Sequence, residues 1–216
     1  AMAQEWFEYV QKLWTADTAF DWDGNFYQGK GVYSLPHPVQ PKMPIINAAG
    51  SEEGRVFAMR NADFLFTPVF DFDQAKATAA DITERAASVG RKVDVLTLCT
   101  VVCRPTQQEA EDYLNWYAEE QADWEAVDNL MTLQGMHAQS FTPEALALYR
   151  DRMAAGHGGF PLVGTPDTIA DLLEKLSVAG IAGTTLAFVD YAKEFPYFRQ
   201  EVLPRLEAKG LRQPVN

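Results

Sequence analysis

Residue types that build reactive centres are scarce in this chain of 216 residues: it has two cysteines and three histidines, His37, His137 and His157. Cys99 and Cys103 fall in one apolar stretch that predicts a β-strand, in which four residues of rise separate them by roughly 13 Å. A disulfide bond needs Cα atoms within about 7 Å of each other. We therefore expect two free, buried thiols, no metal site and no Cys–His nucleophile pair.

Basic residues are also in deficit, because 18 lysines and arginines face 30 acidic residues and leave a formal net charge of −12. This charge argues against nucleic acid and anionic membranes as partners, although a local cluster of backbone N–H groups can still bind a small anion. No apolar run reaches about eighteen residues, and no basic segment precedes an apolar one at the N-terminus. We expect a soluble cytoplasmic protein, and its hydrophobic fraction of 47% is sufficient for a packed core.

The most informative stretch is an apolar run that ends in small residues and is followed by Ser51, two glutamates and a helical pattern. It predicts a parallel strand over residues 44–50 that turns sharply into a helix with Ser51 as its N-cap. Such a turn directs free N–H groups and the positive end of the helix dipole at one point, where a phosphate fits. Gly50 would let the backbone approach that phosphate closely. An ordinary capped turn is the alternative, and we expect Glu52 and Glu53 to point away from the turn.

The rest of the chain alternates strand and helix patterns after a small hairpin around Asp23-Gly24. Further strands are predicted at residues 64–70, 93–102 and 184–190. Helices are predicted at residues 73–89, 107–129, 143–154, 166–179 and about 195–206. This alternation predicts a parallel sheet with helical crossovers, either an open doubly wound sheet or a (β/α)8 barrel. A whole barrel typically needs ~250 residues, so this chain supplies roughly half of one.

Seven short motifs, each weak alone, occur in register along nearly the whole chain. Together they resemble the C-terminal part of the luciferase-like flavin-dependent monooxygenases, nearest the pyrimidine, dimethyl sulfone and alkanesulfonate monooxygenase branch. The motifs are Trp6…Leu13-Trp14, Asp23-Gly24-Asn25-Phe26-Tyr27, Pro36-His37-Pro38-Val39-Gln40-Pro41, Ala49-Gly50-Ser51-Glu52-Glu53-Gly54, Phe57-Ala58…Ala62-Asp63, Leu162-Val163-Gly164-Thr165-Pro166-Asp167 and Tyr191…Phe198…Val202-Leu203-Pro204…Leu206…Gly210-Leu211.

The resemblance implies an α/β fold: the C-terminal half of a parallel (β/α) barrel of TIM type, about four βα units with a helical insertion. Residues 1–216 would form a single domain that lacks the N-terminal half of the family's barrel. The implied activity is that of a monooxygenase in which FMNH2, supplied by a separate flavin reductase, reacts with O2. The resulting flavin peroxide or hydroperoxide oxygenates a small organic substrate. Ser51 matches the family's residue at the FMN phosphate, with Gly50 as its partner, and a homo-oligomer is expected. The alternative is a non-catalytic or truncated half-barrel that serves as a flavin-phosphate binding or assembly module.

Three other positions are weaker candidates. His157 lies in a stretch of residues 156–161 that predicts a flexible loop, and we interpret its glycine-rich run as a mobile lid. His157 is a weak candidate for a catalytic general acid, with an exposed loop residue as the alternative. Asp190 and Tyr191 follow the last strand, where helix capping and edge packing are favoured over chemistry. His37, between two prolines, is expected to be structural.

Overall fold

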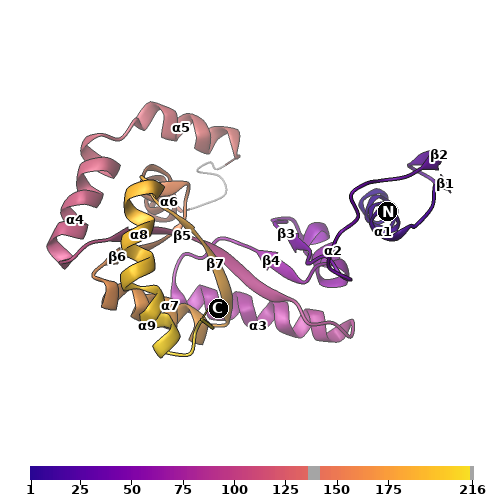
Figure 1. Ribbon diagram of the computed structural model, residues 1–216. Helices are drawn as coiled ribbons and strands as arrows, with labels where there is room; N and C mark the ends of the chain where they lie inside the picture. Colours follow the sequence, from indigo (N-terminus) through magenta and orange to yellow (C-terminus); the bar gives the residue numbers. More distant parts are fainter. Residues whose placement is uncertain (136–141, 215–216) are drawn as a thin grey trace. The chain divides into compact units, whose positions relative to one another are not determined.

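The computed structural model describes residues 1–135 and 142–214, and the chain divides into two compact units, Ala1–Ile45 and Ile46–Asn216. Each unit is described by itself, with the elements labelled as in Figure 1. The single domain expected from the sequence stays a prediction.

The first unit consists of one helix and the expected hairpin. The Glu5 carboxylate accepts hydrogen bonds from the backbone N–H groups of Phe26 and Tyr27, at 2.9 and 2.8 Å, and so ties the helix to the hairpin turn. His37 packs against the ring of Tyr33, with 5.6 Å between ring centroids, in line with the structural role expected of it. The elements are α1 (Met2–Thr15), β1 (Phe20–Asp23) and β2 (Gln28–Val32), the two strands pairing antiparallel.

The second unit is an α/β structure with a five-stranded parallel sheet. Its strands are β3 (Ile46–Asn47), β4 (Phe64–Phe66), β5 (Asp94–Cys103), β6 (Phe160–Gly164) and β7 (Ile181–Ala187). Its helices are α2 (Glu52–Asn61), α3 (Phe72–Ser88), α4 (Gln107–Asn115), the π-helical turn η1 (Trp116–Glu120), α5 (Trp124–Leu133), α6 (Pro143–Gly156), α7 (Pro166–Val178), α8 (Tyr191–Glu201) and α9 (Leu203–Ala208).

The long strand β5 organises the sheet. β7 pairs with it along one edge, opposite residues 95–100. β4 pairs with residues 94–96 of β5, and β6 pairs with residues 99–103. Since β7 pairs with part of each of these two segments along the first edge, β4 and β6 must both lie along the other edge of β5. β3 extends the sheet beyond β4, which gives four parallel βα strands in the order β3-β4-β5-β7, with β6 added beside the C-terminal half of β5.

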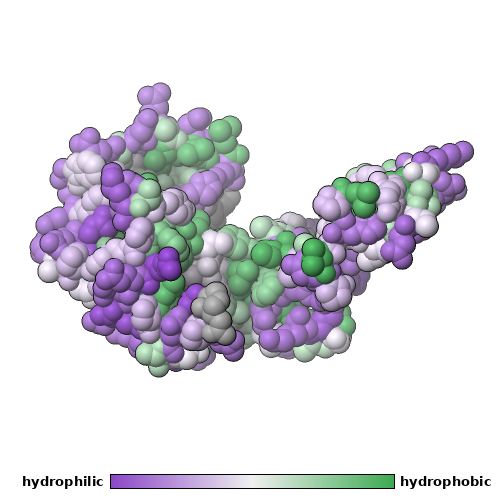
Figure 2. All heavy atoms as spheres, viewed as in Figure 1, coloured by the Kyte–Doolittle hydropathy of each residue, from purple (hydrophilic) through white to green (hydrophobic). Residues whose placement is uncertain are grey.

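The two faces of this sheet differ in burial. Val95, Thr97 and Cys99 of β5 are fully buried on the face toward α3, α7 and α8, which contact β5 and β7. On the opposite face Leu96 and Leu98 are half-buried, and Ile46 of β3 is 59% exposed. In the view of Figure 2, apolar residues gather on the surface over the strands of this unit. One face of the sheet is therefore closed by helices, and the other keeps apolar side chains partly uncovered.

The two cysteines confirm the expectation for them, since both are free and buried in β5. Burial raises the pKa of each thiol to about 11. The thiolate, the nucleophilic form, is therefore disfavoured at neutral pH.

The sequence-based fold is confirmed as a parallel α/β structure, but several boundaries were wrong. The first two strands of the parallel sheet, β3 and β4, are shorter than expected, ending at Asn47 and Phe66 rather than at residues 50 and 70. The last strand spans 181–187, not 184–190, because Ile181 and the small residue Gly183 already pair with Val95 and Leu96 of β5. β6 was missed, since Pro161 argues against a strand. None of the described helices is both long and apolar enough to cross a membrane.

Candidate functional site

The turn between β3 and α2 forms as the sequence predicts. Ser51 is the N-cap of α2: its Oγ accepts a hydrogen bond from the N–H of Gly54 at 3.1 Å, and its carbonyl oxygen accepts from Arg55 at 2.9 Å. Asn47 shapes the approach to the helix, because its Oδ1 accepts from the N–H of Ala49 at 2.9 Å. The chain thus turns from the carboxyl end of a strand into a capped helix within a few residues.

Two glycines of this turn have different functions. A Cβ at Gly54 would lie 2.4 Å from the Cβ of Ala49, so only glycine lets the first helical turn close against the incoming chain. A Cβ at Gly50 would meet nothing within 4 Å. Gly50 and Ser51 are both exposed, so the space in front of the helix N-terminus is open to a ligand.

The charges around the turn permit an anion there. The carboxylate of Glu52, which would repel a phosphate if it faced the turn, forms an ion pair with Arg85 of α3. The hydrogen bond from Arg85 lowers the pKa of Glu52. The carboxylate of Glu53 is exposed. The prediction that these carboxylates avoid the turn is confirmed for Glu52, which is held toward the neighbouring helix.

The donors available at this turn fit a phosphate. The first four N–H groups of an α-helix have no acceptor within the helix. The Ser51 cap satisfies the N–H of Gly54 and Arg55, which leaves those of Glu52 and Glu53 at the positive end of the dipole. Together with the Ser51 hydroxyl and the open space at Gly50, they form a set of donors suited to three phosphate oxygens.

The carboxyl ends of β5 and β7 lie at the same edge of the parallel sheet as this turn, but their polar groups hold the fold together. Arg104 donates to Glu194 at 2.6 Å, and Glu194 accepts in turn from the N–H of Val189 at 3.1 Å. Asp190 is the N-cap of α8, and the hydrogen bond from Lys193 lowers its pKa. Tyr191 donates to the carbonyl oxygen of Leu186 at 3.2 Å. The capping and packing functions favoured for Asp190 and Tyr191 are thus the ones found.

The glycine-rich run before β6 is packed rather than open. Gly156 ends α6, and its carbonyl oxygen accepts a hydrogen bond from Thr100 of β5 at 3.1 Å. A Cβ at Gly159 would lie 2.6 Å from the Thr100 hydroxyl oxygen, which explains the glycine as a close approach to the sheet. The prediction of a flexible loop over residues 156–161 was wrong for Gly156, Phe160 and Pro161, which belong to α6 and β6.

His157 itself is exposed and caps α6 in the left-handed conformation, with φ of 55°. It precedes the amino end of β6, whereas Ser51 follows the carboxyl end of β3. Its ring forms no hydrogen bond with any residue that the structure describes. Its catalytic role stays a prediction without a geometric argument behind it. The phosphate-binding role of the adjacent residues Gly50 and Ser51 also stays a prediction.

The structural functions of three residues were not predicted from the sequence: Gly54 and Asn47 in the Ser51 turn, and Thr100 of β5 beside Gly156. Gly54 carries a visible signal, since glycine in the first turn of a helix is unfavourable unless close packing requires it. Asn47 directly after an apolar run is a turn signal of the same local kind. Thr100 carries none, because nothing within β5 shows that its hydroxyl meets a helix end 56 positions later.

Comparison with known proteins gives the family. Residues 1–183 match the luciferase-like monooxygenase family, and the chain therefore belongs to it. An FMNH2-dependent dimethylsulfone monooxygenase from Pseudomonas putida is 30% identical over 210 residues, covering 94% of this chain and 57% of that protein. A dimethyl-sulfide monooxygenase from Hyphomicrobium sulfonivorans is 28% identical and is matched over 55% of its length.

Solved structures agree on the fold. DmoA from Hyphomicrobium sulfonivorans superposes with a TM-score of 0.82 at 22% identity, covering 98% of this chain and 56% of that one. The long-chain alkane monooxygenase LadA gives a TM-score of 0.77 at 24% identity, over 99% and 57%. The chain thus spans a little over half the length of these relatives, and the predicted part-barrel of TIM type is confirmed.

Proposed function

We propose that this chain is part of an FMNH2-dependent monooxygenase that uses O2 to oxygenate a small organic substrate. The observation that carries the proposal is the turn at Ser51, in a chain of the luciferase-like monooxygenase family. A capped helix end with open space in front of it and two unsatisfied first-turn N–H groups suits the phosphate of FMN.

The residues of the turn would bind and orient the cofactor. The N–H groups of Glu52 and Glu53 and the hydroxyl of Ser51 would donate to the phosphate, and Gly50 would keep the approach free of side chains. The ion pair with Arg85 keeps the Glu52 carboxylate from competing for that position. FMN would supply the reaction with O2, and the chain's own contribution here is a fixed anchor for one end of the cofactor.

An anaerobic titration of this chain with FMNH2 tests the proposal. We expect saturable binding that inorganic phosphate weakens, because both anions would use the same donors. Absence of saturable binding would refute a flavin site in this chain. Dimethyl sulfone is a reasonable first substrate to test, since the relative from Pseudomonas putida acts on it by name.

A second candidate is a non-catalytic half-barrel that binds the flavin phosphate or takes part in assembly. The partly uncovered apolar face of the sheet favours it, since Leu96 and Leu98 are only half-buried and Ile46 is exposed. Substrate turnover by the isolated chain supplied with FMNH2 and O2 would exclude it. Binding of FMNH2 without turnover would support it.

The partners we propose follow from the first candidate. A separate flavin reductase would supply FMNH2 in a transient encounter, as the FMNH2 dependence of the relative implies for that protein. We also propose a homo-oligomer. A coupled assay, in which a flavin reductase and NADH replace added FMNH2, tests the supply route.

A further inference from the structure

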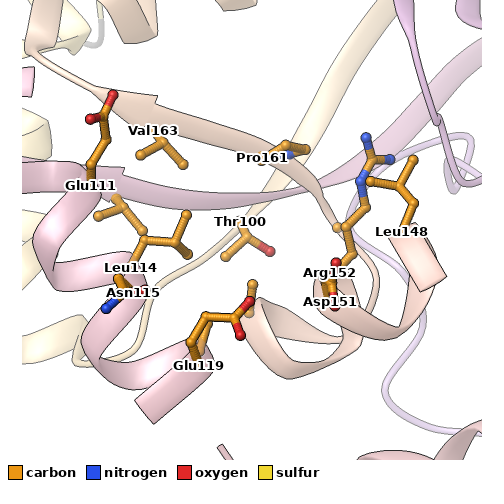
Figure 3. A pocket seen from close by; sticks show the side chains of 14 residues that line it. Thr100, Glu111, Leu114, Asn115, Glu119, Leu148, Asp151, Arg152, Pro161 and Val163 are labelled. Atoms are coloured by element: carbon orange, nitrogen blue, oxygen red, sulfur yellow. The ribbon is translucent and has the colours of Figure 1, made fainter. Parts of the chain in front are cut away.

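A pocket of about 370 Å³ lies within the second unit, between the helical insertion and the sheet, away from the Ser51 turn in the chain. Thr100 and Val102 of β5 form its floor with Pro161 and Val163, their register partners on β6. Figure 3 shows Thr100 between Leu114 and Glu119 on one side of the pocket and Leu148 and Asp151 on the other. This volume lies within the range of small-molecule sites.

Each wall of the pocket contributes apolar side chains. Leu114 and Ala118 line it from α4 and η1, and Leu148 and Ala155 line it from α6. A hydrogen bond of 2.9 Å from the Tyr117 hydroxyl to the carbonyl oxygen of Ala155 joins the two walls and fixes their separation. An apolar group that entered would be removed from water on several sides.

Carboxylates outnumber arginines in the pocket lining, with Glu111, Glu119 and Asp151 against Arg152. Glu119 from η1 and Asp151 from α6 line it from the two walls (Figure 3). Among the described residues, neither carboxylate has a hydrogen bond or an ion pair. Both help to raise the pKa of Arg150, so they lie near it, but the Arg150 guanidinium is already bound by Asp128 at 2.5 and 2.9 Å.

The other arginine beside the pocket keeps its positive charge, but its hydrogen bonds go to backbone carbonyl oxygens. Arg152 lines the wall, but its guanidinium donates to the carbonyl oxygens of Val69 and Phe70, at 3.1 and 2.7 Å. Figure 3 shows that guanidinium on the far side of the pocket from Glu119. The Nε of Arg152 is buried and has no partner among the described residues.

We propose that this pocket binds a small organic cation, a primary ammonium group on an apolar body of the size of a benzyl or short alkyl group. The apolar body lies on the floor of β5 and β6, and the ammonium group lies between Glu119 and Asp151, where charge complementarity replaces the missing ion pairs. The site is separate from the flavin-phosphate turn, and the proposal does not depend on the proposed function.

Calorimetric titration of the whole chain with benzylammonium, benzyl alcohol and benzoate tests the pocket. The three probes share one apolar body and differ in charge. We expect saturable binding of benzylammonium and binding of the other two that is at least about tenfold weaker, with an affinity for the cation that falls as salt is added. Equal binding of benzyl alcohol, or no saturable binding of benzylammonium, would overturn the proposal.

Substitutions locate the binding. Glu119→Gln and Asp151→Asn keep the side-chain shape at exposed positions, and each should weaken benzylammonium binding at least about threefold. Glu125→Gln, an equal charge change on the exposed side of α5 and outside the pocket lining, is the matched control and should leave binding unchanged. If all three substitutions weaken binding equally, the cation is attracted by net charge alone and the proposal fails.

A second variant tests the cavity without changing charge. Ala155→Leu extends an apolar side chain at a half-buried position of the pocket wall. We expect it to reduce benzylammonium binding at least about fivefold, because the added atoms occupy the space of the apolar body. Unchanged binding in a variant with a native circular dichroism spectrum would contradict the assignment to this pocket.

Discussion

At the scale of single residues, the two glycines of the Ser51 turn predict opposite outcomes. Gly54→Ala would place a Cβ 2.4 Å from that of Ala49, so the turn must open despite the better helix propensity of alanine. We expect the free energy of unfolding, measured in urea, to fall by about 1–2 kcal/mol. Gly50→Ala, whose Cβ meets nothing within 4 Å, is the control and should change it by less than about 0.5 kcal/mol. A larger loss at Gly50 than at Gly54 would contradict the geometry of the turn.

The buried thiols give a second residue-scale prediction. Burial raises the pKa of Cys99 and Cys103 from 9.0 to about 11, so neither thiol is ionised at pH 8. We expect no reaction of the native chain with a water-soluble disulfide reagent at pH 8, and reaction of both thiols in urea. Because the folded state holds these protons more tightly, the stability that they contribute is present below pH 9.0 and is lost as the pH rises toward about 11. Rapid labelling of the native chain would show that β5 is not covered as described.

Residue-scale features were the easiest to predict from the sequence. The cap at Ser51 is confirmed, and Thr142 and Thr165 cap α6 and α7 in the same way, because an N-cap depends on a side chain and an N–H group two or three residues away. The break near Asp123, which caps α5 and divides the helical stretch predicted over residues 107–129, carried the same kind of signal and was missed. N-caps can therefore be predicted from the sequence, because the residues that form them are close together in the chain.

At the scale of elements, α6 carries two arginines of unequal importance. Arg152 is buried and holds the carbonyl oxygens of Val69 and Phe70, which follow β4, whereas Arg150 forms a partly exposed ion pair with Asp128. Arg152→Met leaves two buried acceptors unpaired, and we expect a loss of about 2–3 kcal/mol in the free energy of unfolding.

Arg150→Met is the matched control for that experiment. Its ion pair is solvent-screened, so its loss should cost about 1 kcal/mol or less. Equal losses for the two variants in urea unfolding would show that Arg152 does not fasten α6 to the end of β4.

Elements were predicted less well than caps, for a physical reason. Strand ends depend on pairing, and the partners of β3 and β7 lie elsewhere in the chain. β6 was missed because Pro161 opposes strand formation, yet it pairs with Thr100 of β5. The glycines before β6 looked like a loop, although Gly159 is required by the proximity of Thr100.

At the scale of the whole molecule, the alternation of strands and helices was enough to predict a parallel α/β fold, and the motifs in register indicated the family. Both are confirmed. The pocket between the insertion and the sheet could not be predicted, because Glu119 and Asp151 line one pocket only when α6 packs beside η1. Substrate and oligomeric state depend on surfaces that no motif specifies.

The central claim is that the turn at Ser51 binds the phosphate of FMN as well as capping α2. Ser51→Asp separates the two functions, since aspartate is an equally good N-cap but places a negative charge where the phosphate would lie.

The decisive measurement is a paired titration of the wild-type chain and Ser51→Asp with FMN and with riboflavin, which lacks the phosphate. We predict that the wild type binds FMN at least about tenfold more tightly than riboflavin, and that Ser51→Asp loses this preference while unfolding at an unchanged urea concentration. Equal affinities for FMN and riboflavin in the wild type, or a preference for FMN that survives in Ser51→Asp, would contradict the claim.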